Sequence, residues 1–347
     1  MKRLAIGIAL GLVAAPFTGC DKGEDKKEDA SGEKGKDGEK GKDGEKTAEK
    51  KAAAPGATAA DAMKLIPDGA NVVVGLDAAK VAAAPIMKDV MEQVKKEGDA
   101  GDVIDATEAC KVGMSTWKYM VFGGNSEKET EGVAVISAAG LGKKETLECL
   151  SSKYNEKNAD KPLTLKEEDG RVMLVDKDGE ADRSVHSISD DVIALVGKDS
   201  EAKVLGLLKG EGKSAVDGSL KDLVASVDQS AHMYMGMLAT ADIAKNEMEG
   251  LKHVTASADM SSGLSISIAG SFADADKAKT LSEMLNKQFA EMKPMAGIIG
   301  VPPTVVDSVK IEAKENAVVA SAKATQDDLT KISETMKKQL AGPGGPQ

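Results

Sequence analysis

Aromatic side chains are scarce in this sequence of 347 residues, where they make up 2%, and Trp117 is the single tryptophan. Carbohydrate sites and platforms for single-stranded nucleic acid both depend on stacked aromatic rings. The scarcity therefore disfavours both classes of function.

An excess of positive charge is also lacking, since the formal net charge is −11. Residues 21–51 hold ten Lys against eleven Asp or Glu, so the negative charge is carried by the rest of the chain. An acidic body repels phosphate backbones and anionic lipid headgroups. We therefore expect no nucleic-acid partner and no docking to membranes through basic residues.

Histidine is almost absent, which limits catalysis and metal binding. The three histidines are His186, His232 and His253, and no two of them have the spacing of a metal pair on one helix. Ser115 stands in a Gly-Met-Ser-Thr-Trp segment that lacks the closing glycine of a nucleophile elbow and precedes a predicted strand. We predict a protein that is not an enzyme and has no cofactor or metal site.

Two further motifs are incomplete. Gly210-Glu-Gly-Lys-Ser214 resembles the end of a phosphate-binding loop, but its upstream glycine is misplaced and it follows a helix. The acidic segment from Asp176 to Asp182 has its glycine fourth, whereas a calcium-binding EF-hand loop needs it sixth. We interpret the first as a glycine-rich connection and the second as a polar hairpin turn.

The N-terminus has the pattern of an export signal. A basic Met-Lys-Arg is followed by 12 uncharged residues from Leu4 to Ala15, too few to cross a bilayer core of about 30 Å. The segment Phe17-Thr-Gly-Cys20 resembles the bacterial lipobox, although Phe17 replaces the usual Leu, Val or Ile. The resemblance implies a signal peptide over residues 1–19, cleavage before Cys20, and diacylglycerol on its thiol.

The chain also resembles lipoproteins of predatory and myxobacterial-type envelopes. This resemblance rests on the lipobox, the charged low-complexity segment after it, and the Leu65-Ile-Pro-Asp-Gly-Ala70 segment before the first predicted strand. It implies a lipid-anchored envelope protein whose body lies in the periplasm or on the cell surface, and it implies no activity. Asp21 resembles the inner-membrane retention signal of enteric bacteria. That code differs between lineages, and we expect the outer membrane rather than the inner one.

Cys110 and Cys149 are the remaining cysteines of the chain. An even pair in an oxidising compartment favours a disulfide over two free thiols, and no neighbouring base suggests a reactive thiol. The bridge would close a loop of about 40 residues, which in the chain-entropy model stabilises the fold by about 4 kcal/mol. Its expected role is structural.

Hydrophobic periodicity begins after a polar segment. Residues 20–60 show none and predict a disordered charged linker, and residues 342–347 predict a disordered tail. Between them, alternation and turn residues predict strands at 72–76, 117–122, 132–138, 163–166, 171–175, 184–189, 192–196, 233–237, 264–269, 305–313 and 317–322. Helical spacing predicts helices from Pro85 and at 102–111, 143–154, 200–209, 276–292 and 326–340.

The order of predicted elements then repeats. Setting Gly75 against Gly236 aligns Val72, Val74 and Leu76 with Met233, Met235 and Met237, and a second offset aligns Trp117-Lys118 with Leu251-Lys252. We predict an α+β fold of two divergent copies, residues 61–228 and 229–341, of a strand, helix, hairpin, helix, hairpin, helix unit. Consecutive hairpins make the sheet largely antiparallel.

The segment from His232 to Met237 is the sharpest candidate binding site. Its three thioethers resemble the methionine-rich motifs of envelope copper carriers, yet their aligned counterparts are aliphatic, which favours core packing. Our leading hypothesis is a membrane-anchored protein with a non-catalytic binding or structural role and an envelope protein partner. The alternative is a carrier of a small ligand, lipid or metal, with a cleft between the halves lined by Met233, Met235, Met237, Leu264 and Ile266.

Overall fold

The computed structural model describes residues 56–340, except residues 96–97, 129, 160–161, 169–170, 177–182, 241–247 and 298–299. All of these lie in the second of the two units into which the chain divides, residues 55–347. Cys20, the predicted signal peptide and nearly all of the predicted linker lie outside the described residues, as does most of the acidic segment from Asp176 to Asp182.

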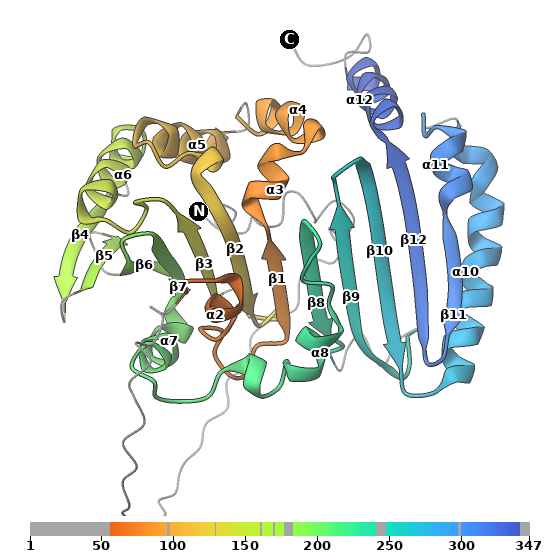
Figure 1. Cartoon of the computed structure of the whole chain (residues 1–347), viewed down its shortest axis with the longest axis horizontal. Coiled ribbons are helices and arrows are strands. Elements are labelled where there is room, and N and C mark those ends of the chain that lie inside the picture. Colours follow the sequence, from red (N-terminus) through yellow and green to blue (C-terminus); the bar gives the residue numbers. More distant parts are fainter. Residues whose placement is uncertain are drawn as a thin grey trace, which may run out of the picture. The chain divides into compact units, whose positions relative to one another are not determined.

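The second unit is built on one 12-stranded sheet (Figure 1). The strands are β1 (Val72–Leu76), β2 (Trp117–Gly124), β3 (Gly132–Ala138), β4 (Leu163–Glu168), β5 (Arg171–Asp176), β6 (Arg183–Ser189), β7 (Val192–Gly197), β8 (Met233–Leu238), β9 (Leu251–Asp259), β10 (Gly263–Phe272), β11 (Lys310–Lys314) and β12 (Ala317–Thr325).

Helices connect the strands. They are α2 (Ala59–Met63), α3 (Ala78–Ala83), α4 (Pro85–Val94), α5 (Gly98–Ala109), α6 (Lys144–Lys157), α7 (Glu201–Leu208), α8 (Lys221–Ser226), α10 (Ala275–Ala296), α11 (Pro303–Ser308) and α12 (Gln326–Leu340), with short 3-10 turns at Met114–Thr116, Lys198–Ser200 and Ala215–Asp217. Aspartate N-caps define the first residues of two helices. The Asp77 carboxylate accepts a hydrogen bond from the Lys80 N–H in the first turn of α3, and the Asp274 carboxylate accepts one from the Lys277 N–H in α10.

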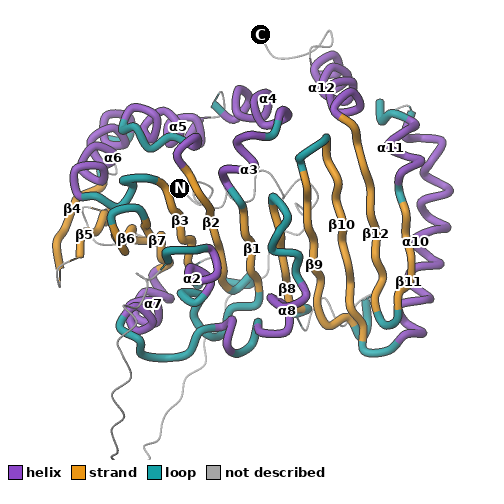
Figure 2. Tube along the Cα trace, in the orientation of Figure 1, coloured by secondary structure: helices purple, strands orange, loops and turns teal. Residues whose placement is uncertain are grey.

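Every pair of neighbouring strands in the described sheet is antiparallel, and the strand order is β11-β12-β10-β9-β8-β1-β2-β3-β7-β6-β5-β4. The predicted α+β class and largely antiparallel sheet are confirmed. Figure 2 shows β8, β9, β10 and β12 running side by side. Because β1 is hydrogen-bonded to both β2 and β8, the two predicted halves join in a continuous sheet at the place where the alternative hypothesis of a ligand carrier put a cleft.

Both faces of the sheet are covered at β1, since all five of its residues are buried although they alternate between the two faces. On the face that we call the α2 face, Val73, Val121 and Val133 pack with residues of α2, α7 and α8. On the opposite face, the α10 face, Leu251, Phe272 and Val318 pack with α10. These two groups of described residues form a larger core under α2 and a smaller core under α10.

The junction of β1 and β8 is closely packed on the α2 face. Gly75 lies beside the ring of Tyr234, and a Cβ atom at Gly75 would stand 1.9 Å from Tyr234 Cζ. The Tyr234 hydroxyl in turn lies 3.7 Å from the sulfur of Met63 in α2. Glycine is required at this position because the tyrosine ring occupies the space of a side chain.

Two details differ from the sequence-based predictions. The expected strand at 305–313 is wrong in its first part, because Pro303 begins helix α11, where a proline at the first helical position is favourable. The short helices α2, α3 and α8 were not predicted, since five or six residues are too few to show helical periodicity. Helix α2 begins at Ala59, within residues assigned to the linker.

The predicted disulfide is confirmed. Cys110 directly follows α5, Cys149 lies in α6, and their Cα atoms are 5.8 Å apart. Lys157 of α6 also forms ion pairs with Asp102 and Asp105 of α5, at 2.6 and 3.2 Å. The covalent bond therefore joins two helices that also pack against each other.

Candidate functional site

One row of apolar side chains crosses the whole sheet on the α10 face. Directly opposed residues of neighbouring strands share a face, so the strand registers define such a row. From β11 to β4 it reads Ile311, Ala320, Ile268, Ala256, Met235, Val74, Phe122, Ala134, Leu195, Val185, Leu174 and Leu165. No polar side chain interrupts it.

Exposure along this row is uneven. Val74 is 9% exposed and Leu174 is 3% exposed, whereas Ile268 is 46% exposed. Ile266, two residues before it on the same face, is 36% exposed. The most water-accessible side chain of the row is therefore Ile268 of β10, next to half-buried Ala256 of β9 and Met235 of β8; Phe122, Ala134 and Leu195, beyond the buried Val74, are half-buried as well. The part considered as a site is the one around Ile268.

We call this part the methionine face and define it by the following residues, which share the α10 face of three adjacent strands: Met233, Met235 and Met237 of β8, Ala256 and Ala258 of β9, and Leu264, Ile266 and Ile268 of β10. Met233 is buried, while Met235, Met237 and Leu264 are half-buried. Ala258 is paired with both Met233 and Ile266. The structure thus brings together the methionines, Leu264 and Ile266, which sequence reasoning had grouped; Ala256, Ala258 and Ile268 were missed.

Helices flank the methionine face. Leu281 and Leu285 of α10 pack with Val254, Val318 and Ile311 on the same side of the sheet. Helix α12 also lies against β10 and β12.

Helix α8 packs against β8 and β9, but on the opposite face. A Cβ atom at Gly236, which alternates with Met235 and Met237, would meet Leu223 and Val227 at about 3 Å. Helix α10 packs with Leu251 and Val254 in the first part of β9, on the same side as the methionine face. The methionine face is therefore bordered by α10 on its own side of the sheet, and α8 lies behind it.

The other face of the same strands is polar. The row next to the apolar one reads Tyr234, Ser257, Ser267, Ser321 and Lys310 across β8, β9, β10, β12 and β11. Serine and lysine alternate with isoleucine and alanine along each strand, as in a sheet with one solvated face. The apolar character of the methionine face is thus specific to one side.

The thioethers and the imidazole of the copper-like motif lie apart. His232 precedes Met233 directly, and successive residues of an extended strand point to opposite faces. The His232 Nδ1 lies 3.3 Å from a carboxylate oxygen of Asp259. In the described part of the chain no group of three His, Cys, Asp or Glu side chains is placed to hold a metal ion.

The weak motifs have structural positions. Ser115 is exposed in the 3-10 turn before β2. Gly210 and Gly212 have φ angles of 78° and 85°, which glycine adopts easily, and they connect α7 to the next turn. The hydroxyl of Ser214 accepts the Val216 N–H and donates to the Ile66 carbonyl, so it is used in the fold.

A buried polar cluster that the sequence did not reveal lies under α7. His186 Nε2 is 2.8 Å from a carboxylate oxygen of Glu201 and 2.7 Å from the hydroxyl oxygen of Ser184. Burial lowers the pKa of His186 below its ordinary value of 6.5, although Glu201 opposes this effect. A Ser-His-Glu relay uses both imidazole nitrogens, whereas here both partners meet Nε2 and the buried Nδ1 has no hydrogen-bond partner.

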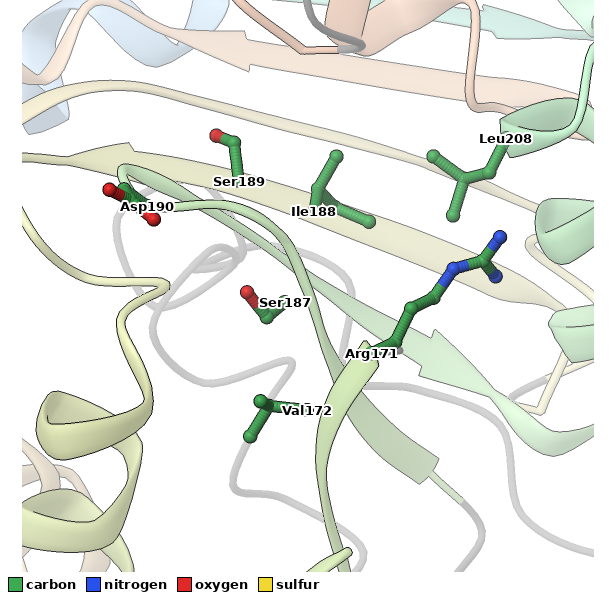
Figure 3. Close-up of a pocket in the computed structure, with 7 residues that line it drawn as sticks. All are labelled: Arg171, Val172, Ser187, Ile188, Ser189, Asp190 and Leu208. Atoms are coloured by element: carbon green, nitrogen blue, oxygen red, sulfur yellow. The ribbon is translucent and has the colours of Figure 1, made fainter. Parts of the chain in front are cut away.

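A cavity of about 310 Å³ opens where β5 and β6 separate. These strands pair at Met173 with His186 and at Leu174 with Val185, so their ends beyond these pairs diverge. Figure 3 shows Arg171, Ile188 and Leu208 on one side of the cavity and Val172 with Ser187 on the other. The Ser187 hydroxyl donates to the Gly142 carbonyl at 2.6 Å, so it serves the fold rather than a ligand.

Comparison of the chain with protein-family models, with curated proteins and with solved structures finds no match. None of the described helices combines the length and the hydropathy needed to cross a membrane.

Proposed function

We propose that the chain is a lipid-anchored protein of the cell envelope whose body binds a partner or ligand and performs no catalysis. The lipobox-like segment ending at Cys20 supports the anchor, and the charged segment after it supports a spacer. The body lies in the periplasm or on the cell surface, with the outer membrane favoured over the inner one.

The exposed methionine face is the observation that carries the binding role. Ile266 and Ile268 are large aliphatic side chains at 36% and 46% exposure, and they share one sheet face with the half-buried Met235 and Met237, from which Ala256 and Ala258 of β9 separate them. Scattered apolar residues on a surface need no explanation, but a contiguous apolar patch marks an interaction site. Methionine suits such a site because its flexible, polarisable side chain adapts to different occupants.

The arrangement of polar groups favours binding over chemistry. In the Ser184-His186-Glu201 cluster both partners meet the same imidazole nitrogen, Nε2, whereas a catalytic relay uses both nitrogens, and the imidazole is fully buried. The carboxylates whose pKa is lowered, such as Asp191 and Asp259, are held by hydrogen bonds from neighbouring serine, lysine or backbone groups. Each of these groups has a role in the fold.

We further propose that residues 61–228 and 229–341 arose by duplication, and the strand registers support this. The sequence alignment equates Val72 with Met233 and Gly124 with Ala258; Val72 pairs with Gly124, and Met233 pairs with Ala258. Val74 and Met235 are aligned with each other and also directly paired, as expected for a twofold axis through that pair.

An irregularity supports the same duplication. The β2–β3 register shifts where Lys118 is passed over, and the β9–β10 register shifts where Lys252 is passed over. Lys118 and Lys252 are the two lysines that the sequence alignment equates. Bulges are retained features of a fold, so a bulge at matched positions is hard to obtain by chance.

A ligand carrier is the second candidate, and the methionine face favours it in a modified form. The ligand would lie on a continuous sheet face, since β1 and β8 are paired where a cleft was expected. Lipid fits this surface better than metal, because the imidazole of His232 and the thioethers lie on opposite faces.

Site-specific crosslinking in native membranes tests the binding role. A photoreactive amino acid at Ile268 should form adducts, and one at Ser267, the adjacent residue on the polar face, should form few. Equal adduct yields at the two positions, or none at either, would remove the methionine face as the binding site. Loss of acylation in the Cys20→Ser chain, read by mass spectrometry, tests the anchor separately.

A further inference from the structure

We infer that the methionine face binds an acyl chain of a phospholipid from the membrane that holds the anchor. This inference rests on the proposed function, because the anchor is what keeps the body beside that membrane. The surface involved is the part of the apolar row around Ile268, with Ala256 and Met235 beside it.

The surface offers an occupant nothing polar. Each of β8, β9 and β10 is paired on both sides, so their backbone N–H and C=O groups are used within the sheet. The side chains of the methionine face are aliphatic or thioether. An extended peptide placed there would lose hydration of its backbone without gaining a hydrogen bond, whereas an acyl chain has no polar group to satisfy.

The methionine face has a strip of small side chains between larger ones, which suits an acyl chain. Ala256 and Ala258 form a low strip along β9, with Met235 and Met237 on one side and the isoleucines of β10 on the other. In the proposed first copy the position aligned with Ala256 is Phe122, whose ring fills the corresponding place. The strip is thus open in the second half of the sheet and closed in the first.

Charge and reach decide which lipid group is recognised and where it comes from. The chain carries a net charge of −11, so the body does not attract anionic headgroups, which leaves the acyl chain as the attractive part. Thirty-five residues separate Cys20 from Gly56, and a chain of that length reaches at most about 120 Å. Phospholipids of the anchoring membrane therefore lie within reach of the body.

The experiment uses the full chain carrying Cys20→Ser, so that binding does not depend on the anchor. The protein is incubated with vesicles of phosphatidylethanolamine and phosphatidylglycerol, separated from them by gel filtration, and examined by native mass spectrometry. We expect a bound phospholipid. Ile268→Glu should reduce the bound fraction at least tenfold, and Ser267→Glu, which places the same charge on the polar face, should leave it within twofold.

A second pair of variants guards against misfolding. Ala256→Phe should close the strip and also reduce binding at least tenfold, while Thr255→Phe on the opposite face should not, and urea unfolding midpoints identify variants that fold like the parent. Four outcomes would each overturn the inference. They are protein that stays empty, equal binding by Ile268→Glu and Ser267→Glu, retention of free fatty acid only, and capture of a protein helix instead of lipid. If the chain binds lipid but is never acylated in cells, the proposed anchor is wrong and the lipid-binding inference stands.

Discussion

Replacing Gly75 by alanine should destabilise the junction between β1 and β8. The new Cβ would stand 1.9 Å from Tyr234 Cζ, and ordinary contact between carbon atoms begins near 3.5 Å, so the ring must move by about 1.5 Å. Tyr234 is 6% exposed and Met63, which lies behind its hydroxyl, is 3% exposed. Because the ring and its neighbour are both buried, moving the ring forces other side chains to shift, and we expect a loss of about 3 kcal/mol, the upper end for overpacking.

A double-mutant cycle separates this steric cause from other effects of the alanine. Tyr234→Ala alone should cost about 3 to 5 kcal/mol, because it removes a buried ring. In the double variant the clash is gone, so the total loss should fall short of the sum of the single losses by about 2 kcal/mol or more.

Urea unfolding followed by Trp117 fluorescence and by circular dichroism measures the free energies. Gly297→Ala is the matched control: Gly297 has a helical φ of −65° and nothing within 4 Å of its Cβ position, so its effect should stay within about 0.5 kcal/mol. Additive losses in the Gly75 and Tyr234 cycle would refute the reasoning.

Three other perturbations have defined outcomes. Replacing Cys110 and Cys149 by serine opens a loop of sequence separation 39 and should lower the free energy of unfolding by about 4 kcal/mol; a loss below about 1 kcal/mol by urea unfolding would contradict this. Because burial lowers the folded pKa of His186 below 6.5, the unfolded chain binds a proton first as the pH falls, so this contribution to stability is complete above pH 6.5 and is lost below it. Thermal unfolding should therefore show a smaller drop in midpoint between pH 7.5 and 5.5 for His186→Gln than for the parent, and parallel profiles would count against it. Cys20→Ser should leave an unprocessed, unacylated precursor with an unchanged circular dichroism spectrum, as checked by mass spectrometry; acylation of that variant would contradict the lipobox assignment.

Local pattern was enough to place most elements of the sheet. The alternation at 132–138 marks β3 to the residue, and helical spacing at 326–340 marks α12 equally well. These segments are long enough for a period to be read. The misassigned segment at 305–308 begins with two β-branched valines, Val305 and Val306, and proline at the helix start outweighed their strand propensity.

The candidate site was only partly predictable, for a different physical reason. The sequence shows which residues alternate on one strand, so Met233, Met235 and Met237 were recognisable as a group. Which strands lie beside β8 depends on long-range pairing, and so Ala256 and Ile268 gave no signal before the sheet order was known. The His186 cluster was hidden likewise, because Glu201 reaches it from the helix after the next strand.

The pairing of β1 with β8 also sets a condition on how the molecule is made. Val74 must find Met235 in its register, and the intervening residues are synthesised first. Until β8 has been synthesised, β1 is the unpaired edge strand of an otherwise complete seven-stranded sheet. That edge is apolar and prone to aggregate, because β1 contains Val72, Val73, Val74 and Leu76. A nascent chain stalled between Ser226 and Met233 should therefore be the most aggregation-prone length of this protein. A chaperone that binds the chain at that stage would have the unpaired edge of β1 to cover.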